Sequence, residues 1–214
     1  MSLQSKSEES LQALENFLPA GAFEPVSQYL KTYKVHLTIT RSRKTVLGDY
    51  RHAISTQSNH RISVNGNLNR YAFLITLLHE LAHLLCYNEY KNKVAAHGIE
   101  WKRIYSKILS TFIQLNIFPD DIRAALEQAI QNPAASSCRE ILLMKTLHKY
   151  DNHPPHVQLL EALPYGALFK IENGSIFKKG ALIRKRFKCT LVHNDKVYLF
   201  SPIHVVHLLD GTND

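Results

Sequence analysis

The chain has few cysteines and no long apolar run. The three cysteines, Cys86, Cys138 and Cys189, are odd in number and far apart, so a disulfide framework is not expected. No apolar stretch approaches the roughly 20 residues of a membrane-spanning helix, and the polar segment 1–10 lacks the apolar core of a signal peptide. We therefore expect a cytoplasmic protein with reduced thiols and no membrane partner.

Acidic residues are also scarce. The 26 Lys and Arg residues outnumber the 18 Asp and Glu residues, which gives a net charge of +8. Residues 25–110 alone hold thirteen basic against four acidic residues, and a second basic stretch runs from Lys178 to Lys188. Such a surface suggests a polyanionic partner, most simply nucleic acid. A solvated basic face without a partner explains the charge equally well.

A segment near residue 80 has the strongest chemical pattern. Apolar residues recur there at three- and four-residue steps from residue 73 to 85 and predict a helix. The helix contains His79-Glu80-Leu81-Ala82-His83, and residues four apart lie above one another on a helix, so both imidazoles can reach one point. This HExxH pattern is typical of zinc peptidases, in which the histidines hold Zn²⁺ and the glutamate is the general base. An accidental match would leave a costly polar cluster on an apolar helix.

A catalytic zinc needs a third protein ligand and one open position. His97 lies just before a second predicted helix, and a loop over residues 88–96 would let that helix fold back and bring His97 to the metal. Glu89 or Glu100 remain alternative third ligands, because carboxylates also bind zinc. The metzincin pattern is excluded, because it places a histidine six residues after His83, where this chain has Glu89.

A small sheet is predicted before the HExxH helix and further helices after it. Alternating apolar residues predict strands over 35–39, 46–51 and 62–64. The turn at Asn65-Gly66-Asn67 follows, and Asn67 or Asn69 can cap the helix. Residues 101–112, 119–130 and 141–150 are expected to be helical. The strand over 46–51 is our candidate for the edge along which a substrate would lie.

The pattern changes to β after residue 166. Strands are predicted over 167–171, 182–191, 196–200 and 204–207, so residues 155–214 should form a small β-rich module. A hairpin in it carries basic residues with Phe177 and Phe187 among them, and this is a candidate nucleic-acid surface. Its basic residues are Lys178, Lys179, Arg184, Lys185, Arg186 and Lys188. A charged hairpin that protects a sheet edge from aggregation is the alternative.

The HExxH motif followed by His97-Gly98-Ile99-Glu100-Trp101 resembles the SprT-like family of zinc metallopeptidases, which includes the repair protease Spartan. Segments 42–51 and 62–65 also look like the family's sheet segments, and the resemblance covers about residues 25–115. It implies an α+β fold, with a zincin-like metallopeptidase domain over residues 1–135. It also implies one catalytic Zn²⁺ on His79, His83 and His97, with Glu80 as the general base.

The resemblance implies a zinc-dependent endopeptidase that acts on DNA-associated or DNA-crosslinked proteins. Many members carry a C-terminal zinc ribbon of paired cysteines, but Cys138 and Cys189 have no partner at CxxC spacing, so no second zinc is expected. The alternative is a nucleic-acid- or transcription-elongation-associated zinc-binding protein with little or no proteolytic activity. Intact Glu80 favours the peptidase. Candidates for stabilising the oxyanion are Tyr50, Arg51, Tyr87 and Tyr105.

Overall fold

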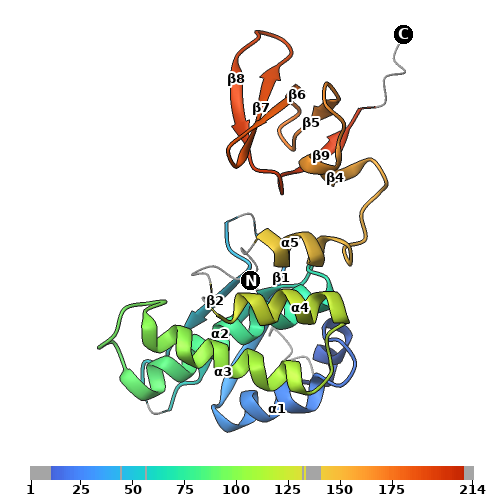
Figure 1. The fold of residues 1–214 in the computed structure, drawn as a ribbon. Helices are drawn as coiled ribbons and strands as arrows, with labels where there is room; N and C mark the ends of the chain where they lie inside the picture. The colour runs from blue at the N-terminus through green and yellow to red at the C-terminus, as the bar shows by residue number, and fades with distance from the viewer. Residues whose placement is uncertain (1–10, 44, 56, 132, 134–140, 210–214) are drawn as a thin grey trace, which may run out of the picture. The chain divides into compact units, whose positions relative to one another are not determined.

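The computed structural model of the 214-residue chain describes residues 11–43, 45–55, 57–131, 133 and 141–209. The chain divides into two compact units, residues 1–150 and residues 151–214. The first unit combines helices with a small sheet, and the second is built mainly of strands (Figure 1). The predicted α+β fold class is confirmed. Among the described residues, no helix has both the length and the apolar character needed to cross a membrane.

The first unit begins with helical segments, continues through three strands and ends with four helices. In chain order these are the 3-10 helix η1 (Leu11–Phe17), α1 (Phe23–Thr32), β1 (Val35–Thr40), β2 (Gly48–Arg51), β3 (His60–Asn65), α2 (Arg70–Tyr90), α3 (Ile99–Gln114), α4 (Asp120–Ala129) and α5 (Ile141–His148). The order of helices and strands agrees with the expectation from sequence periodicity.

The three strands form a sheet in the order β1-β3-β2. β1 runs parallel to β3, and β2 runs antiparallel to β3, with Tyr50 opposite Ile62. Within the described residues β2 therefore pairs on one side only and is an edge strand. It begins at Gly48, two residues after the predicted start. An open edge of this kind can accept an extended peptide as a further strand.

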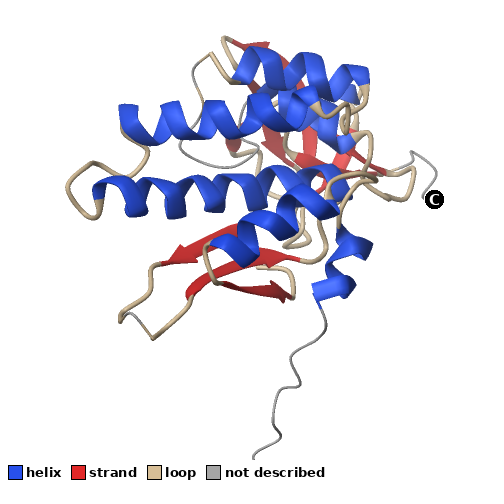
Figure 2. Ribbon diagram, turned by 90° about the horizontal axis from the view of Figure 1, so that it is seen from below, coloured by secondary structure: helices blue, strands red, loops and turns tan. Residues whose placement is uncertain are grey.

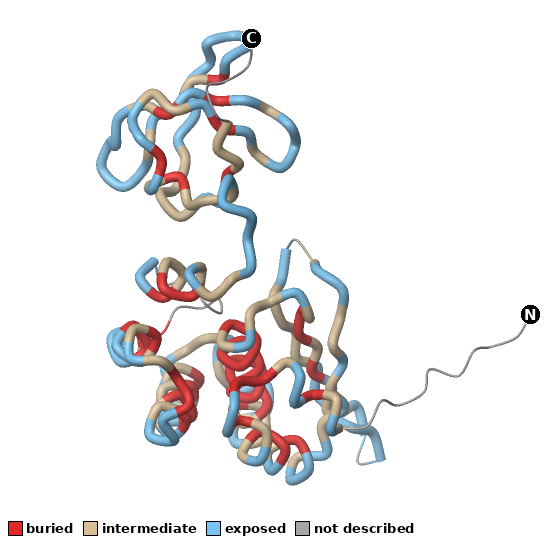
Figure 3. The backbone as a smooth tube through the Cα atoms, turned by 90° about the vertical axis from the view of Figure 1, so that its right-hand side faces the viewer, coloured by how far each residue is buried: buried red, intermediate tan, exposed pale blue. Residues whose placement is uncertain are grey.

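Helix α2 is the centre of the first unit. Residues 72–82 are all buried, and α2 packs on β2 and β3, on α3 and on η1. Figure 2 shows the helices beside the three-stranded sheet, and the buried positions of Figure 3 are concentrated in the interior of the unit. A helix that is apolar all round is stable only with such neighbours. The chemistry of His79 and Glu80 is therefore built into the core.

The start of α2 is fixed by Asn69. Its side-chain Oδ1 accepts hydrogen bonds from the backbone N–H groups of Tyr71 and Ala72 at 3.1 and 2.9 Å. Its amide nitrogen also donates to the carbonyl of Leu147 at 3.0 Å. The structure thus uses Asn69, one of the two predicted capping residues, and ties α5 to the beginning of α2.

The second unit is a six-stranded antiparallel sheet. It contains β4 (Val157–Leu159), the 3-10 helix η2 (Leu160–Ala162), β5 (Leu168–Lys170), β6 (Ile176–Ile183), β7 (Arg186–Leu191), β8 (Val197–Phe200) and β9 (Val205–Leu208), in the sheet order β4-β9-β5-β6-β7-β8. Its small core includes Phe169, Phe177 and Val206. The prediction of one strand over 182–191 is wrong, because the chain turns between Ile183 and Arg186 and separates β6 from β7.

Candidate active site

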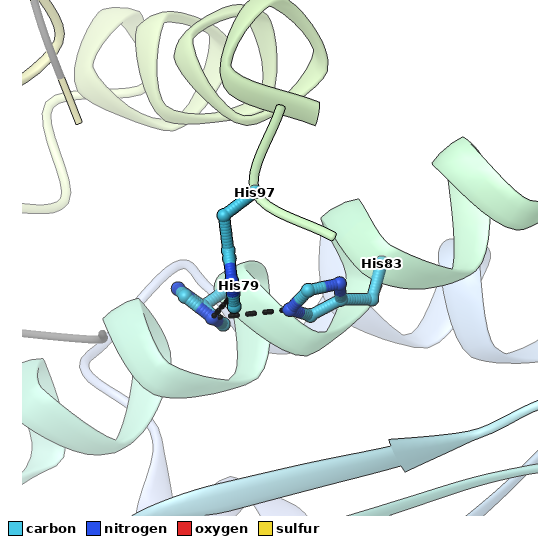
Figure 4. Close-up of side chains that lie close together, drawn as sticks. All are labelled: His79, His83 and His97. Carbon is cyan, nitrogen blue, oxygen red and sulfur yellow. Dashed lines mark hydrogen bonds between the residues drawn. The ribbon is translucent and has the colours of Figure 1, made fainter. Parts of the chain in front are cut away.

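Three histidines converge at one point of the first unit (Figure 4). His79 and His83 project from successive turns of α2, and His97 comes from the segment between α2 and α3. The Nε2 atom of His79 lies 3.3 Å from that of His83 and 3.2 Å from that of His97. The spacing along α2 and the predicted return of the chain at His97 thus bring all three side chains together.

The two nitrogen separations from His79 match those around a tetrahedral metal ion. A zinc ion with Zn–N distances of about 2.0–2.1 Å needs donor nitrogens about 3.3–3.4 Å apart. Burial, with a smaller contribution from the neighbouring imidazoles, lowers the pKa of His79 to about 3 and that of His83 to about 4. Burial also lowers the pKa of His97. All three rings are neutral at pH 7, which is the form that binds metal.

The position of His97 depends on strained backbone and on Trp101. His97 has a φ of 59°, a left-handed conformation that costs a non-glycine residue about 1 kcal/mol or more. Trp101, fully buried on the first turn of α3, packs its ring within 4.6–5.2 Å of the three imidazole centroids. Trp101 therefore forms a wall against the three rings. From the sequence, Trp101 was the first residue of a predicted helix and the last of the His97-Gly98-Ile99-Glu100-Trp101 segment, with no contact to the histidines predicted.

Glu80 lies beside the histidines, between α2 and the edge strand β2. It is buried, and burial, together with the nearby Asp49 and against the opposing effect of Arg43, raises the pKa of its carboxyl to about 8. A divalent cation nearby would lower this pKa. A Cβ at Gly48 would lie 2.5 Å from Oε1 of Glu80. Gly48 therefore gives the carboxylate its space, and a glycine within a strand often marks such a close approach.

The segment leading into β2 is anchored by Asn65 and Arg43. The buried Asn65 side chain donates to the carbonyls of Arg43 and Val46 at 3.1 and 3.0 Å and accepts from Nε of Arg43 at 2.8 Å. A terminal nitrogen of Arg43 also donates to Oγ of Ser63 at 3.0 Å. These contacts hold β2 in register at the point where Gly48 meets Glu80. Sequence patterns gave no sign of this network.

A cleft of about 530 Å³ opens beside His83. Its wall includes residues from β2 and the segment after it, from the end of α2, and from the segment before α3. The lining residues are Tyr50, Arg51, His52, Ile54, His83, Cys86, Tyr87, Lys91, Asn92, Val94, Ala95, Ala96 and Trp101. The cleft thus adjoins the three histidines.

Tyr50 links the cleft to β3. Its ring is parallel to the imidazole of His83, with centroids 6.5 Å apart, and its hydroxyl lies 2.9 Å from Nδ1 of His60. The backbone N–H of Ala53 also donates to this nitrogen at 3.4 Å. Nδ1 is therefore an acceptor, and the hydroxyl of Tyr50 donates to it. His60 had been given no role from the sequence.

The structure also places the alternative metal ligands and the candidates for stabilising an oxyanion. Among the described residues, the group around His79 contains three histidines and no carboxylate. Glu89 instead forms an ion pair with Arg103 at 3.2 Å. Of the four candidates for stabilising an oxyanion, Tyr50, Arg51 and Tyr87 line the cleft. Tyr105 is buried against His79, with its ring centroid 5.3 Å away.

The basic hairpin of the second unit is only partly exposed. Lys178, Arg184, Lys185, Arg186 and Lys188 are exposed, and the register places Lys178 opposite Thr190 and Lys188 opposite Leu199. These two lysines therefore share the outer sheet face, since alternate residues share a face.

Lys179 is not part of the exposed surface that was predicted to bind nucleic acid. Its side chain is buried, and its ammonium donates to the carbonyls of Glu161 and Leu163 and lies 4.1 Å from the ring centroid of Phe187. Burial lowers the pKa of this ammonium. The charge of Lys179 is therefore used inside the unit, and the five remaining basic residues make up the exposed set.

Comparison with protein families gives a match within the first unit. The model of the SprT-like family matches residues 20–121. This segment belongs to the SprT-like family. The matched range contains α1, the three-stranded sheet, α2 and α3, and therefore all three converging histidines. The SprT-like family is associated with zinc metallopeptidase function. No curated protein and no solved structure gave a significant match to the chain.

Proposed function

We propose that the chain is a zinc-dependent endopeptidase that acts on nucleic-acid-associated proteins. The observation that carries the proposal is the convergence of three neutral imidazoles beside Glu80 and the open edge of β2. Three nitrogen ligands with room for a fourth ligand are typical of catalytic zinc sites, whereas structural sites use four protein ligands. The SprT-like family match supports the same activity.

The residues divide the chemistry among them. Zn²⁺ held by His79, His83 and His97 would acidify a water molecule and polarise the peptide carbonyl. Glu80 would accept the proton as the water attacks and would pass it to the leaving amine. An extended substrate would pair with the free edge of β2, which places its backbone across α2 at Glu80. Tyr50 could donate from β2 to the carbonyl oxygen as charge develops on it only by exchanging its hydrogen bond to Nδ1 of His60 for one to that oxygen.

The proposed association with nucleic acid rests on charge. The hairpin formed by β6 and β7 exposes five basic side chains, and the outer face also carries Leu199 on β8. Such side chains neutralise phosphates without reading a base sequence. We expect this hairpin to hold DNA or RNA and so to select protein substrates that are bound to it. Binding should weaken steeply with salt.

Two variants test the assignment of the metal centre and the base. Glu80→Gln should retain one zinc per chain and lose cleavage by about 100-fold or more, because the general base is removed. The matched control is Glu89→Gln, an exposed glutamate on the same helix. His97→Ala should lose zinc, whereas the exposed His193→Ala should keep it. Zinc is measured by elemental analysis, and cleavage with a DNA-binding protein as substrate, with and without single- and double-stranded DNA.

The outcomes separate the peptidase from the alternative. Cleavage that needs Glu80 and increases with DNA supports the proposal. One zinc per chain and DNA binding without Glu80-dependent cleavage would instead support a zinc-containing nucleic-acid-binding protein. Full zinc occupancy in His97→Ala would contradict the ligand assignment.

A further inference from the structure

The cleft beside His83 differs from the metal centre in its charge. We infer that it binds an acidic side chain of the substrate, at a residue next to the bond that is cleaved. The inference rests on the proposed peptidase function and adds a substrate class to it. It is carried by the geometry and charge of the thirteen lining residues.

The charged groups of the cleft are all basic. Arg51 and Lys91 lie on its wall together with His52, and the lining contains neither aspartate nor glutamate. Asp49 contacts Arg51 through Nε at 2.9 Å, and this contact leaves the terminal guanidinium nitrogens as the groups that would meet a carboxylate. The ammonium of Lys91 lies 5.1 Å from the ring centroid of Tyr87. Two cations at the wall favour a negatively charged guest.

The rest of the wall is apolar and aromatic. The rings of His52 and Tyr87 stack with centroids 4.5 Å apart and 5° between their planes. Cys86 and Trp101 are buried and line the same cleft as Val94. Methylene groups can pack on such a surface while a terminal carboxylate reaches the cations. A glutamate side chain combines both features, so it fits the cleft better than a lysine or a wholly apolar side chain.

The location of the cleft relates it to the scissile bond. His83 is at once a member of the histidine cluster and a lining residue of the cleft. Tyr50 lines the cleft from β2, the strand along which the substrate backbone would lie. A side chain in the cleft therefore belongs to a residue immediately beside the carbonyl held at the histidines. The cleft would in this way determine which peptide bond is cut.

Binding of peptide hydroxamates to the full-length, zinc-quantified Glu80→Gln protein tests this inference. The hydroxamate fixes the register at the metal, and the neighbouring residue is Glu, Gln or Lys in otherwise identical compounds. We expect the Glu compound to bind about threefold to tenfold more tightly than the Gln compound, with Lys weakest, as for charges in a partly solvated site. The additional double change Arg51→Glu and Lys91→Glu should reverse this order.

The matched control is the double change Lys93→Glu and Arg70→Glu, which alters net charge equally at exposed positions outside the cleft. It should keep the preference for Glu. Equal binding of the Glu and Gln compounds would overturn the inference while leaving the metal centre intact. Equal displacement of all three compounds by single-stranded DNA would also overturn it and would assign the cleft to nucleic acid.

The peptidase assignment can fail separately. A preference for Glu in binding, together with no Glu80-dependent cleavage by the wild-type chain, would keep the cleft assignment and overturn the peptidase. Absence of zinc-dependent hydroxamate binding would overturn both.

Discussion

Gly48→Ala is the sharpest test of how the edge strand positions Glu80. A Cβ at residue 48 would lie 2.5 Å from Oε1 and 2.8 Å from Cγ of Glu80, and 2.9 Å from Cγ2 of Thr76. Since carbon atoms of this kind do not approach within about 3.0 Å, Glu80 must move by roughly 0.5 Å or more. Its carboxylate is the end of a flexible side chain, whereas β2 is held by Asn65 and Arg43. The carboxylate of Glu80 should therefore be displaced, whereas β2 should keep its position.

The expected effects on stability and activity differ greatly. Overpacking of a buried site costs about 1–3 kcal/mol, and the value here should lie near 1 kcal/mol because the carboxylate can yield. A catalytic group displaced by about 1 Å can lose about 100-fold in rate. A displacement of roughly 0.5 Å or more should therefore lower kcat by about 10-fold to 100-fold, with one zinc still bound and only a small decrease in the free energy of unfolding. Urea denaturation, zinc analysis and cleavage kinetics measure the three quantities.

Gly66→Ala is the matched control for this prediction. A Cβ there would lie 2.8 Å from Cγ2 of Ile39, a comparable overlap, but none of its nearest atoms belongs to Glu80. It should reduce stability to a similar extent and leave kcat nearly unchanged once the fraction folded is taken into account. Full activity in Gly48→Ala would refute the argument that this glycine makes room for a working Glu80.

Two further predictions concern the fold. Asn69→Ala should lower the free energy of unfolding by about 1–2 kcal/mol, because Asn69 caps α2 and also donates to Leu147. Asn67→Ala, two residues earlier in the chain, should change it by much less, and equal losses in urea titrations would contradict the cap assignment. Lys179→Ala should destabilise the protein by about 1–3 kcal/mol by leaving buried carbonyls without a donor, whereas Lys178→Ala should leave stability unchanged and weaken DNA binding. Calorimetry measures the stability and fluorescence anisotropy the DNA binding. The reverse pattern would contradict the assignment of Lys179 as the buried lysine and Lys178 as the exposed one.

Much of the candidate site could be predicted because its signals are local. The step from His79 to His83 is fixed by helix geometry, and His97 stands directly before a helix with a clear apolar period. A capping asparagine, Asn67 or Asn69, was recognisable for the same reason, and the structure uses Asn69. The hydrogen bond between Tyr50 and His60, in contrast, joins residues from two strands whose register depends on the whole sheet.

The errors in the second unit have equally specific causes. The turn after β6 uses Arg184 in a left-handed conformation, with a φ of 57°, so no glycine or asparagine marks it. Alternation of residue types across this turn imitates one long strand. Lys179 was predicted to be on the surface because lysine is rarely buried. Its ammonium is held inside by carbonyl groups of the segment before β5, which no local pattern indicates.

The short segment between α2 and α3 contributes both to the histidine cluster and to the wall of the cleft. It carries His97, and its Lys91, Val94 and Ala95 form part of the cleft wall. A metal ion and a peptide would therefore favour the same conformation of this segment, and each would raise the affinity of the other by the same factor. Substrate should slow removal of the metal by a chelator. If the proposed function holds, cells short of zinc would then lose substrate selectivity together with activity, and the metal-free protein would not capture substrates.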